Sequence, residues 1–260
     1  MKKPKDFFER YARQVSLHEI GVSGQEKLAR GRVLLVGVGG LGSVAGLYLA
    51  AAGVRTLGLI DGDKLELSNL QRQIAYNTED VGSLKTQAAG RTFSALNPHV
   101  EIVIHEGRLT RGNAGDIVAQ YGFVIDATDN FESKFLIADT CHRLQKPYSH
   151  GGIAGFGGQA MTVLPGKTAC YRCVFGAPPP ADGALPRGPL GAVPGVVGSV
   201  QATEALKWML RCGHLLTNRI LTYDALEMTC RIVAISRDRQ CPLCGERAHV
   251  QRGKVTRRKR

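Results

Sequence analysis

A glycine-rich turn constrains this chain more than any other feature of its sequence. The turn reads GVGGLG and directly follows the apolar run Arg32–Val36. Gly37, Gly39 and Gly42 match the pattern Gly-x-Gly-x-x-Gly, in which the backbone turns out of a strand and presents N–H groups at the start of a helix, where phosphates bind. The turn therefore predicts a nucleotide-binding α/β fold, and on its own it favours NAD or FAD.

Apolar runs typical of strands alternate with helical patterns over the first 150 residues. The predicted strands are Arg32–Val36, Thr56–Ile60, Val100–His105 and Phe123–Asp129. The predicted helices are Gly42–Ala52, Ser83–Leu96 and Phe131–Leu144. Such alternation is typical of a parallel sheet covered by helices on both faces. We therefore predict a Rossmann-like α/β fold with a mixed, mostly parallel sheet.

The flanking segments complete one predicted domain over residues 1–246. The first thirty residues read as helical, with Ser23 as a helix N-cap. Residues 176–198 hold six of the eleven prolines and six glycines, which predicts a long crossover loop without regular structure. A helix from residue 199 and two strands are expected after the loop.

Charge and composition restrict the function classes. The formal net charge is +12, but residues 247–260 hold seven Lys or Arg and no acid, and the remainder carries an unremarkable +5. This tail is expected to be disordered and either solubilising or a docking segment for an acidic partner or RNA, and we do not expect nucleic acid as the main ligand. Since no signal peptide or membrane span is recognisable, a cytoplasmic protein is expected.

Polar residues cluster after the second predicted strand. A dinucleotide needs one acid for its ribose, whereas a triphosphate calls for an arginine and a lysine that form charge-assisted hydrogen bonds. The segment DGDKLELSNLQRQ and the helical pattern after it supply Asp61, Asp63, Asn69, Arg72, Gln73 and Lys85. This cluster favours a nucleoside triphosphate over a dinucleotide.

A second polar group lies at the end of the fourth predicted strand. The sequence DATDN supplies Asp126, Asp129 and Asn130 there. An open α/β sheet binds its ligand at the carboxyl ends of its strands, and a carboxylate at that edge suits Mg²⁺. Taken singly, each residue reads as a solvated loop side chain, but together at strand ends they indicate a site.

Four of the seven cysteines form two Cys-x-x-Cys pairs. In a cytoplasmic chain such pairs favour a metal over a disulfide. The pairs, Cys170 with Cys173 and Cys241 with Cys244, are separated by 67 residues. That interval is longer than in a compact zinc ribbon. Spacing alone therefore does not decide whether the four cysteines bind one metal ion together. We predict that Cys141, Cys212 and Cys230 are buried packing residues.

Eight motifs give the chain a family resemblance. In order they are RYARQ, GVGGLG, DGDKLELSNLQRQ, VGSLK, DATDNF, CYRC, GVVGSVQATEALK and CPLCG. In this order they resemble the ThiF/MoeB/HesA family of ubiquitin-activating-like adenylyltransferases, over nearly the whole chain from Arg10 to Gly245.

The resemblance implies an adenylation reaction with ATP as substrate. The C-terminal glycine carboxylate of a small ubiquitin-fold sulfur carrier ending in Gly-Gly attacks the α-phosphate, giving an acyl-adenylate and pyrophosphate. It also implies one structural Zn²⁺ per chain, held by Cys170, Cys173, Cys241 and Cys244, and a homodimer in which Arg13 enters the partner's site.

The resemblance assigns roles to the polar residues. Gly40 approaches the nucleotide and Asp61 holds the ribose. Asn69, Arg72 and Lys85 bind phosphates, while Asp129 carries Mg²⁺ with help from Asn130. The further nucleotide-binding candidates are Gly37, Gly39, Gly42, Asp63 and Gln73, and the candidate catalytic residues are Arg13, Arg72, Lys85 and Asp129.

Two positions depart from the family pattern. Members that carry sulfur or an acyl group covalently have a cysteine in the crossover loop, where this chain has Ala184 and no cysteine from Cys173 to Cys212. We therefore expect the reaction to stop at the acyl-adenylate, with a separate sulfur donor such as a cysteine desulfurase or rhodanese. The second departure is Lys134, where many relatives have arginine, and its role stays open.

Three alternatives remain at the level of the sequence. A related dehydratase of threonylcarbamoyladenosine in tRNA shares the nucleotide motifs, and the basic tail would suit it, but the double Cys-x-x-Cys fits the sulfur-carrier branch better. A NAD-dependent oxidoreductase would need a hydride acceptor site that is not visible. A non-enzymatic scaffold is possible because a fold alone proves no activity.

Overall fold

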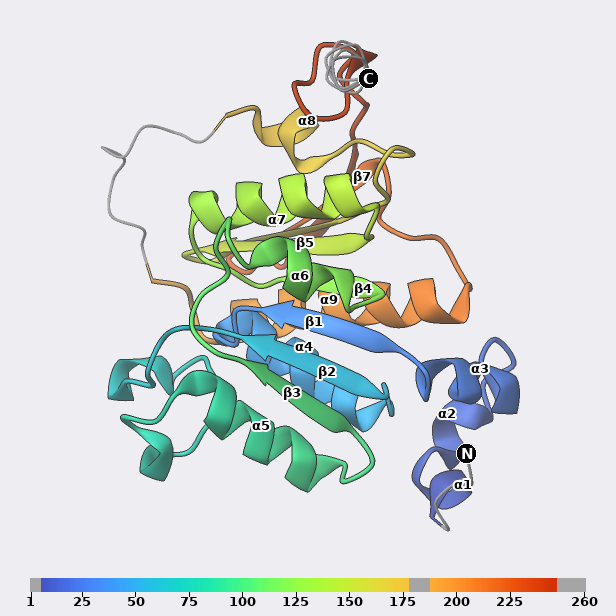
Figure 1. Ribbon diagram of the computed structural model, residues 1–260, viewed down its shortest axis with the longest axis vertical. Coiled ribbons are helices and arrows are strands. Elements are labelled where there is room, and N and C mark those ends of the chain that lie inside the picture. The colour runs from blue at the N-terminus through green and yellow to red at the C-terminus, as the bar shows by residue number, and fades with distance from the viewer. Residues whose placement is uncertain (1–5, 178–187, 247–260) are drawn as a thin grey trace, which may run out of the picture.

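Eight strands form one mixed sheet in the computed structural model, which describes residues 6–177 and 188–246. Their order across the sheet is β3-β2-β1-β4-β5-β6-β7-β8, parallel from β3 to β5 and antiparallel from β5 to β8 (Figure 1). The mixed sheet predicted from the sequence is confirmed. The strands are β1 (Arg32–Val36), β2 (Thr56–Ile60), β3 (Glu101–His105), β4 (Phe123–Asp126), β5 (Tyr148–Ala154), β6 (Gly157–Val163), β7 (Arg219–Asp224) and β8 (Thr229–Ala234).

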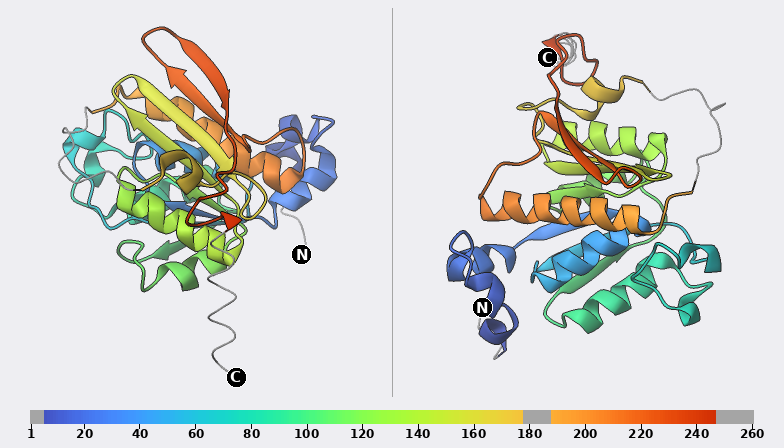
Figure 2. Two further views of the ribbon diagram at one scale, coloured as in Figure 1. Left: turned by 90° about the horizontal axis from the view of Figure 1, so that it is seen from above. Right: turned by 180° about the vertical axis from the view of Figure 1, so that it is seen from behind.

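Helices cover both faces of the sheet, with α4, α5 and α9 on one side and α6 and α7 on the other (Figures 1 and 2). The helices of the N-terminal half are α1 (Phe7–Arg10), α2 (Ala12–Val15), α3 (Gly21–Leu28), α4 (Gly40–Ala51) and α5 (Lys85–Leu96), with short 3₁₀ turns η1 (Leu67–Asn69) and η2 (Thr78–Asp80). The later helices are α6 (Ala114–Ala119), α7 (Phe131–Leu144), α8 (Tyr171–Phe175) and α9 (Ala192–Leu210).

Strand β1 lies at the centre of the core. Val33 and Leu35 pack into the hydrophobic cluster with α4, α5 and α9, while Leu34 and Val36 pack into the opposite cluster with α6 and α7. Because successive side chains of a strand point to opposite faces, a strand covered on both faces must be apolar throughout. This explains why the run before the glycine turn carries no alternation of polar and apolar residues.

The structure corrects the predicted crossover loop. Helix α9 begins at Ala192, so regular structure starts six residues before the predicted end of the loop at residue 198. Pro194 is its third residue, where the missing N–H costs nothing because the first N–H groups of a helix have no intrahelical acceptor.

The N-terminal segment also differs from the prediction. Ser23 lies inside α3, whose N-cap is Ile20, so the predicted capping role is wrong. The preceding helical stretch is two single turns that meet at Tyr11, whose phenol is buried against Asn97. The short helices α6 and α8 were not predicted, because segments of five or six residues carry little periodicity.

One of the three unpaired cysteines contradicts its predicted burial. Cys141 is fully buried, but Cys230 is exposed because it lies on β8, the edge strand of the sheet. Cys212 is half-buried. Within the described residues no helix is long and apolar enough to cross a bilayer. Ala184 and the basic tail 247–260 lie outside the described residues.

Candidate active site

The glycine turn is held against the end of β4. Gly37 adopts a left-handed conformation with φ of 88°, and a Cβ there would lie 2.8 Å from Ala127 O. A Cβ on Gly42 would overlap Gly37 O, so this residue must also be glycine for the turn to close. Gly39 precedes the first residue of α4 as its N-cap. The turn therefore directs the N-terminus of α4 toward the carboxyl edge of the sheet.

Asp61 braces this turn from the end of β2. Its carboxylate accepts hydrogen bonds from Val38 N at 2.8 Å and from Asp63 N at 2.9 Å. Burial raises the pKa of Asp61, against the lowering effect of these two N–H donors. Because each carboxylate oxygen has a further lone pair, Asp61 can also accept a hydrogen bond from a ribose hydroxyl.

Residues in and after η1 also lie close to the glycine turn. Arg72 lies beside the turn, because a Cβ on Gly40 would be 3.6 Å from its Cγ. The Gln73 amide lies beside Gly39, and its buried Oε1 has no hydrogen-bond partner within the described structure. Asn69 is buried, and its Oδ1 accepts from Glu66 N, which shapes η1. A buried acceptor without a partner is a place where a ligand donor is expected.

Lys85 is the first residue of α5 and its ammonium is buried. Lys85 Nζ lies 3.2 Å from Asp63 Oδ2, and Lys85 N donates to Asp63 O at 3.1 Å. Asp63 Oδ1 in turn accepts from Arg108 Nη2 at 2.6 Å. Arg108 comes from the loop after β3 and was not among the predicted site residues, because no motif marks it.

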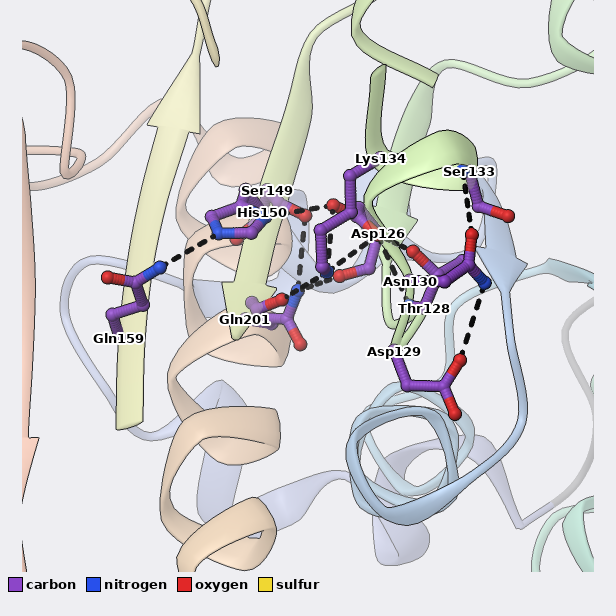
Figure 3. A network of polar contacts seen from close by, with 11 residues as sticks. Asp126, Thr128, Asp129, Asn130, Ser133, Lys134, Ser149, His150, Gln159 and Gln201 are labelled. Carbon is purple, nitrogen blue, oxygen red and sulfur yellow. Dashed lines mark hydrogen bonds and ion pairs between the residues drawn. The ribbon is translucent and has the colours of Figure 1, made fainter. Parts of the chain in front are cut away.

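A charge network centred on the buried Asp126 lies beside the site (Figure 3). Asp126, the last residue of β4, accepts from His150 Nδ1 at 2.8 Å and from Thr128 Oγ1 at 2.7 Å. Lys134 Nζ lies 3.3 Å from Asp126 Oδ1 and donates to Gly151 O at 2.7 Å. The Gln201 amide of α9 donates to Asp126 O. These contacts join β4, α7, β5 and α9 at one point.

The charges in this network are compensated. Burial by itself would raise the pKa of Asp126, but the Lys134 ammonium and the hydrogen bond from His150 outweigh burial and hold the pKa at about 2. Burial, together with the Lys134 charge, lowers the pKa of His150, so the imidazole is neutral and Nδ1 is the donor. The role of Lys134, open at the sequence level, is to neutralise Asp126.

Asp129 and Asn130 lie next to this network, on its solvent-exposed side. Asp129 is exposed and points away from the buried charges (Figure 3). Asn130 is the N-cap of α7, and its Oδ1 accepts from Ser133 N at 2.9 Å. Ala127 and Thr128, which precede Asp129 in the same loop, lie against Gly37.

Among the predicted catalytic and nucleotide-binding residues, Arg13 is the one that the structure places away from the glycine turn. It lies exposed on α2. Its neighbour Gln14 donates to Ala52 O at the C-terminal end of α4, whereas the glycine turn is at the N-terminal end. The twelve residues of α4 separate the two ends by about 18 Å at about 1.5 Å per residue.

The four paired cysteines meet although they are far apart in the chain. All four Sγ atoms lie within 4.8 Å of one another, and the neighbouring pairs Cys170–Cys241 and Cys173–Cys244 are 3.5 and 3.3 Å apart. A tetrahedral zinc ion with Zn–S of ~2.3 Å needs sulfurs about 3.8 Å apart. The four thiols are linked through hydrogen bonds. The hydrogen bond from Cys170 lowers the pKa of Cys244 and raises that of Cys170, and burial raises the pKa of Cys173, so Cys244 is the first of these three to become a thiolate. The donor set fits zinc.

Comparisons with known proteins agree with this geometry. The chain is 43% identical over 255 residues to the sulfur carrier protein adenylyltransferase of Thermus thermophilus, covering 95% of this chain and 94% of that protein. It is also 43% identical over 242 residues to the SAMP-activating enzyme E1 of Haloferax volcanii, covering 92% and 89%.

A solved structure and a family model complete the comparison. Escherichia coli MccB with ATP superposes with a TM-score of 0.81 at 24% identity, over 93% of this chain and 76% of that one, which shows the shared fold alone. The model of the ThiF family matches residues 11–243. The chain described here therefore belongs to the ThiF family.

Proposed function

We propose that this protein adenylates the C-terminal glycine carboxylate of a small ubiquitin-fold sulfur carrier, consuming ATP and releasing pyrophosphate. The observation that carries the proposal is 43% identity, over nearly all of both chains, to a protein named as a sulfur carrier protein adenylyltransferase. The gathering of Asp61, Arg72, Lys85 and Asp129 around one glycine turn supports the same reaction.

The proposed chemistry needs charge stabilisation more than acid–base catalysis. The attacking carboxylate is already ionised, so no general base has to remove a proton. Arg72 and Lys85 would bind the phosphates, and the N–H groups at the start of α4 would hold the oxygens that gain charge as pyrophosphate leaves. Asp61 would fix the ribose. Mg²⁺, held by Asp129 with Asn130 beside it, would neutralise phosphate charge.

We propose a structural zinc ion in the cysteine cluster. Four thiolates would complete its tetrahedron and leave no open position for substrate. Asp238 N donates to Cys173 Sγ and Arg237 Nη2 donates to Cys244 O, so the C-terminal segment closes around the cluster. Zinc near one equivalent per chain, lost in Cys244→Ser and retained in Cys230→Ser, would support the assignment. Full metal content in Cys244→Ser would contradict it.

The partners follow from the same proposal. Arg13 would act in the site of a second subunit of a homodimer, because it lies far from the glycine turn of its own chain. The acyl-adenylate would pass to a separate sulfur donor, such as a cysteine desulfurase or rhodanese. Residues 1–246 would form the adenylyltransferase domain, and the tail 247–260 would not take part in the reaction.

The decisive experiment is ATP–pyrophosphate exchange with a matched carrier that ends in Gly-Gly. Exchange is expected only when the carrier is present, because its carboxylate is the nucleophile. Lys85→Ala and Asp129→Ala should abolish exchange. Lys64→Ala removes an exposed lysine from the neighbouring segment and should leave exchange intact.

Other outcomes would replace the proposal. Exchange without any carrier, or hydride transfer with NAD, would contradict adenylation of a carrier. ATP-dependent dehydration of threonylcarbamoyladenosine in tRNA, with no response to a carrier, would assign the chain to the alternative branch.

A further inference from the structure

Arg108 lies across the loop that follows β2. Its side chain runs over Gly62, where an added Cβ would overlap Arg108 Cγ and lie 3.1 Å from Nε. Its guanidinium reaches Asp63 Oδ1. Gly62 separates Asp61, the proposed ribose ligand, from Asp63, so the arginine stem covers the backbone between these two carboxylates. The contact needs glycine at position 62, since any larger residue would displace the stem.

The loop that carries Arg108 is itself fixed. Asn113 Nδ2 donates to Arg108 O at 3.0 Å, and Asn113 Oδ1 accepts from Thr110 N at 2.7 Å. Leu109, the next residue, is buried in the cluster beneath α6. The backbone that carries Arg108 is therefore fixed by hydrogen bonds and by the burial of Leu109.

Asp63 is shared by two cations in different surroundings. The Lys85 side chain is 9% exposed and the Arg108 side chain is 74% exposed. An exposed ion pair contributes at most about 1 kcal/mol to stability, so the Arg108 contact adds little to the fold. We therefore look for an effect of Arg108 on the charge balance around Asp63 and Lys85.

We propose that Arg108 is a positioning residue for ATP: it keeps Asp63 neutralised when the Lys85 ammonium turns from Asp63 to a phosphate. This inference rests on the proposed function. Without Arg108, binding of ATP would leave the Asp63 carboxylate unpaired next to the triphosphate, and part of the attraction between Lys85 and phosphate would be lost to repulsion. With Arg108 present, Lys85 can leave Asp63 at little cost.

The test measures MgATP affinity by calorimetry, without carrier, and KM for ATP in the exchange reaction. Arg108→Ala should weaken binding and raise KM roughly fivefold, the size expected for one coupled charge pair, while the KM for the carrier stays unchanged. Arg111→Ala is the matched control, because it removes the same charge from the same exposed loop without touching Asp63. Arg108→Lys should recover part of the affinity.

A double mutant separates this role from general electrostatics. In an Asp63→Asn background no carboxylate needs neutralising, so adding Arg108→Ala should change ATP affinity less than twofold. An equal loss in both backgrounds, or equal effects of Arg108→Ala and Arg111→Ala, would overturn the inference while leaving the proposed function intact. Failure of the wild-type protein to bind MgATP would overturn both.

Discussion

Asp126 illustrates at the level of one residue how the site is supported. A carboxylate without solvent exposure is stable only when hydrogen bonds and an opposite charge replace the lost water. Lys134, His150 and Thr128 supply these. Because Asp126 begins the loop that carries Asp129, this buried network sets the position of the proposed Mg²⁺ ligand without contacting any ligand itself.

Removing the cation from this network should be costly. Lys134→Met leaves Asp126 buried with hydrogen bonds but no counter-charge, and we expect a loss of about 3 kcal/mol in the free energy of unfolding, measured with urea. Lys167→Met, at an exposed lysine, should change stability by less than about 0.5 kcal/mol. A loss in Lys134→Met as small as in the control would show that Asp126 does not depend on this charge.

His150 should make stability depend on pH. Burial and the Lys134 charge lower its pKa in the folded protein, so below the ordinary value of 6.5 the unfolded chain binds the extra proton. Its contribution is therefore complete above pH 6.5 and decreases as the pH falls, by at most about 1.4 kcal/mol per pH unit.

The variant His150→Gln tests this dependence. Glutamine retains an N–H donor but does not titrate, so the decrease in stability from pH 7 to pH 5 should be smaller than in the wild type. Urea unfolding at both pH values measures the difference. Equal decreases in both proteins would rule out His150 as the titrating group.

Helix α9 shows, at the level of an element, where sequence patterns mislead. Its first turn contains Pro194 and Gly195, residues typical of a loop, yet Pro194 lies so close to Gly40 that a Cβ there would be 3.0 Å from the proline Cβ. Tertiary packing here outweighs the low helix propensity of the residues. The same close approach continues at Gly198, where a Cβ would lie 2.6 Å from Leu41 O on α4.

Two glycines of α9 therefore respond oppositely to alanine. Gly195 has open space around its Cβ position, so Gly195→Ala should stabilise the protein by about 0.5–1 kcal/mol through helix propensity. Gly198→Ala should destabilise it by about 1–3 kcal/mol, because the methyl group meets the α4 backbone. Thermal unfolding of both variants measures this, and destabilisation of equal size in both would refute the packing argument.

Site residues whose position is fixed by one strand or helix could be predicted from the sequence. Site residues brought together by long-range contacts could not. Asp61 and Asp126 lie at the ends of buried strands. Because these strands are parallel, both residues can be predicted to lie at the same carboxyl edge of the sheet. Arg108 meets Asp63 across 45 residues, and its segment carries no pattern that marks a site. His150 reads as an ordinary strand residue, since nothing in the sequence indicates that β5 places it against Asp126.

At the level of the whole molecule, the proposed catalytic residues occupy two separate ends. The glycine turn, Lys85 and Asp129 lie at the carboxyl edge of the strands, whereas Arg13 lies with the N-terminal helices beyond the far end of α4. A single chain does not bring them together. The proposed site is therefore complete only if two subunits share it.

Mixing two inactive variants tests this arrangement. In a dimer of Arg13→Ala with Asp129→Ala, one site has both residues and the other has neither. Random assortment of equal amounts should restore about a quarter of the wild-type exchange activity, because half of the dimers are mixed and each has one complete site. Each variant alone should be inactive, and an inactive mixture after verified subunit exchange would mean that Arg13 acts within its own chain or elsewhere.

Helix α9 also runs from one of these two ends to the other (Figure 2). Pro194 at its start touches the glycine turn, and Leu210 at its end accepts a hydrogen bond from Lys27 of α3. The nineteen residues of α9 therefore form one continuous hydrogen-bonded element that joins the glycine turn to α3. The glycine turn and α3, which follows the segment carrying Arg13, are thus packed against opposite ends of the same helix.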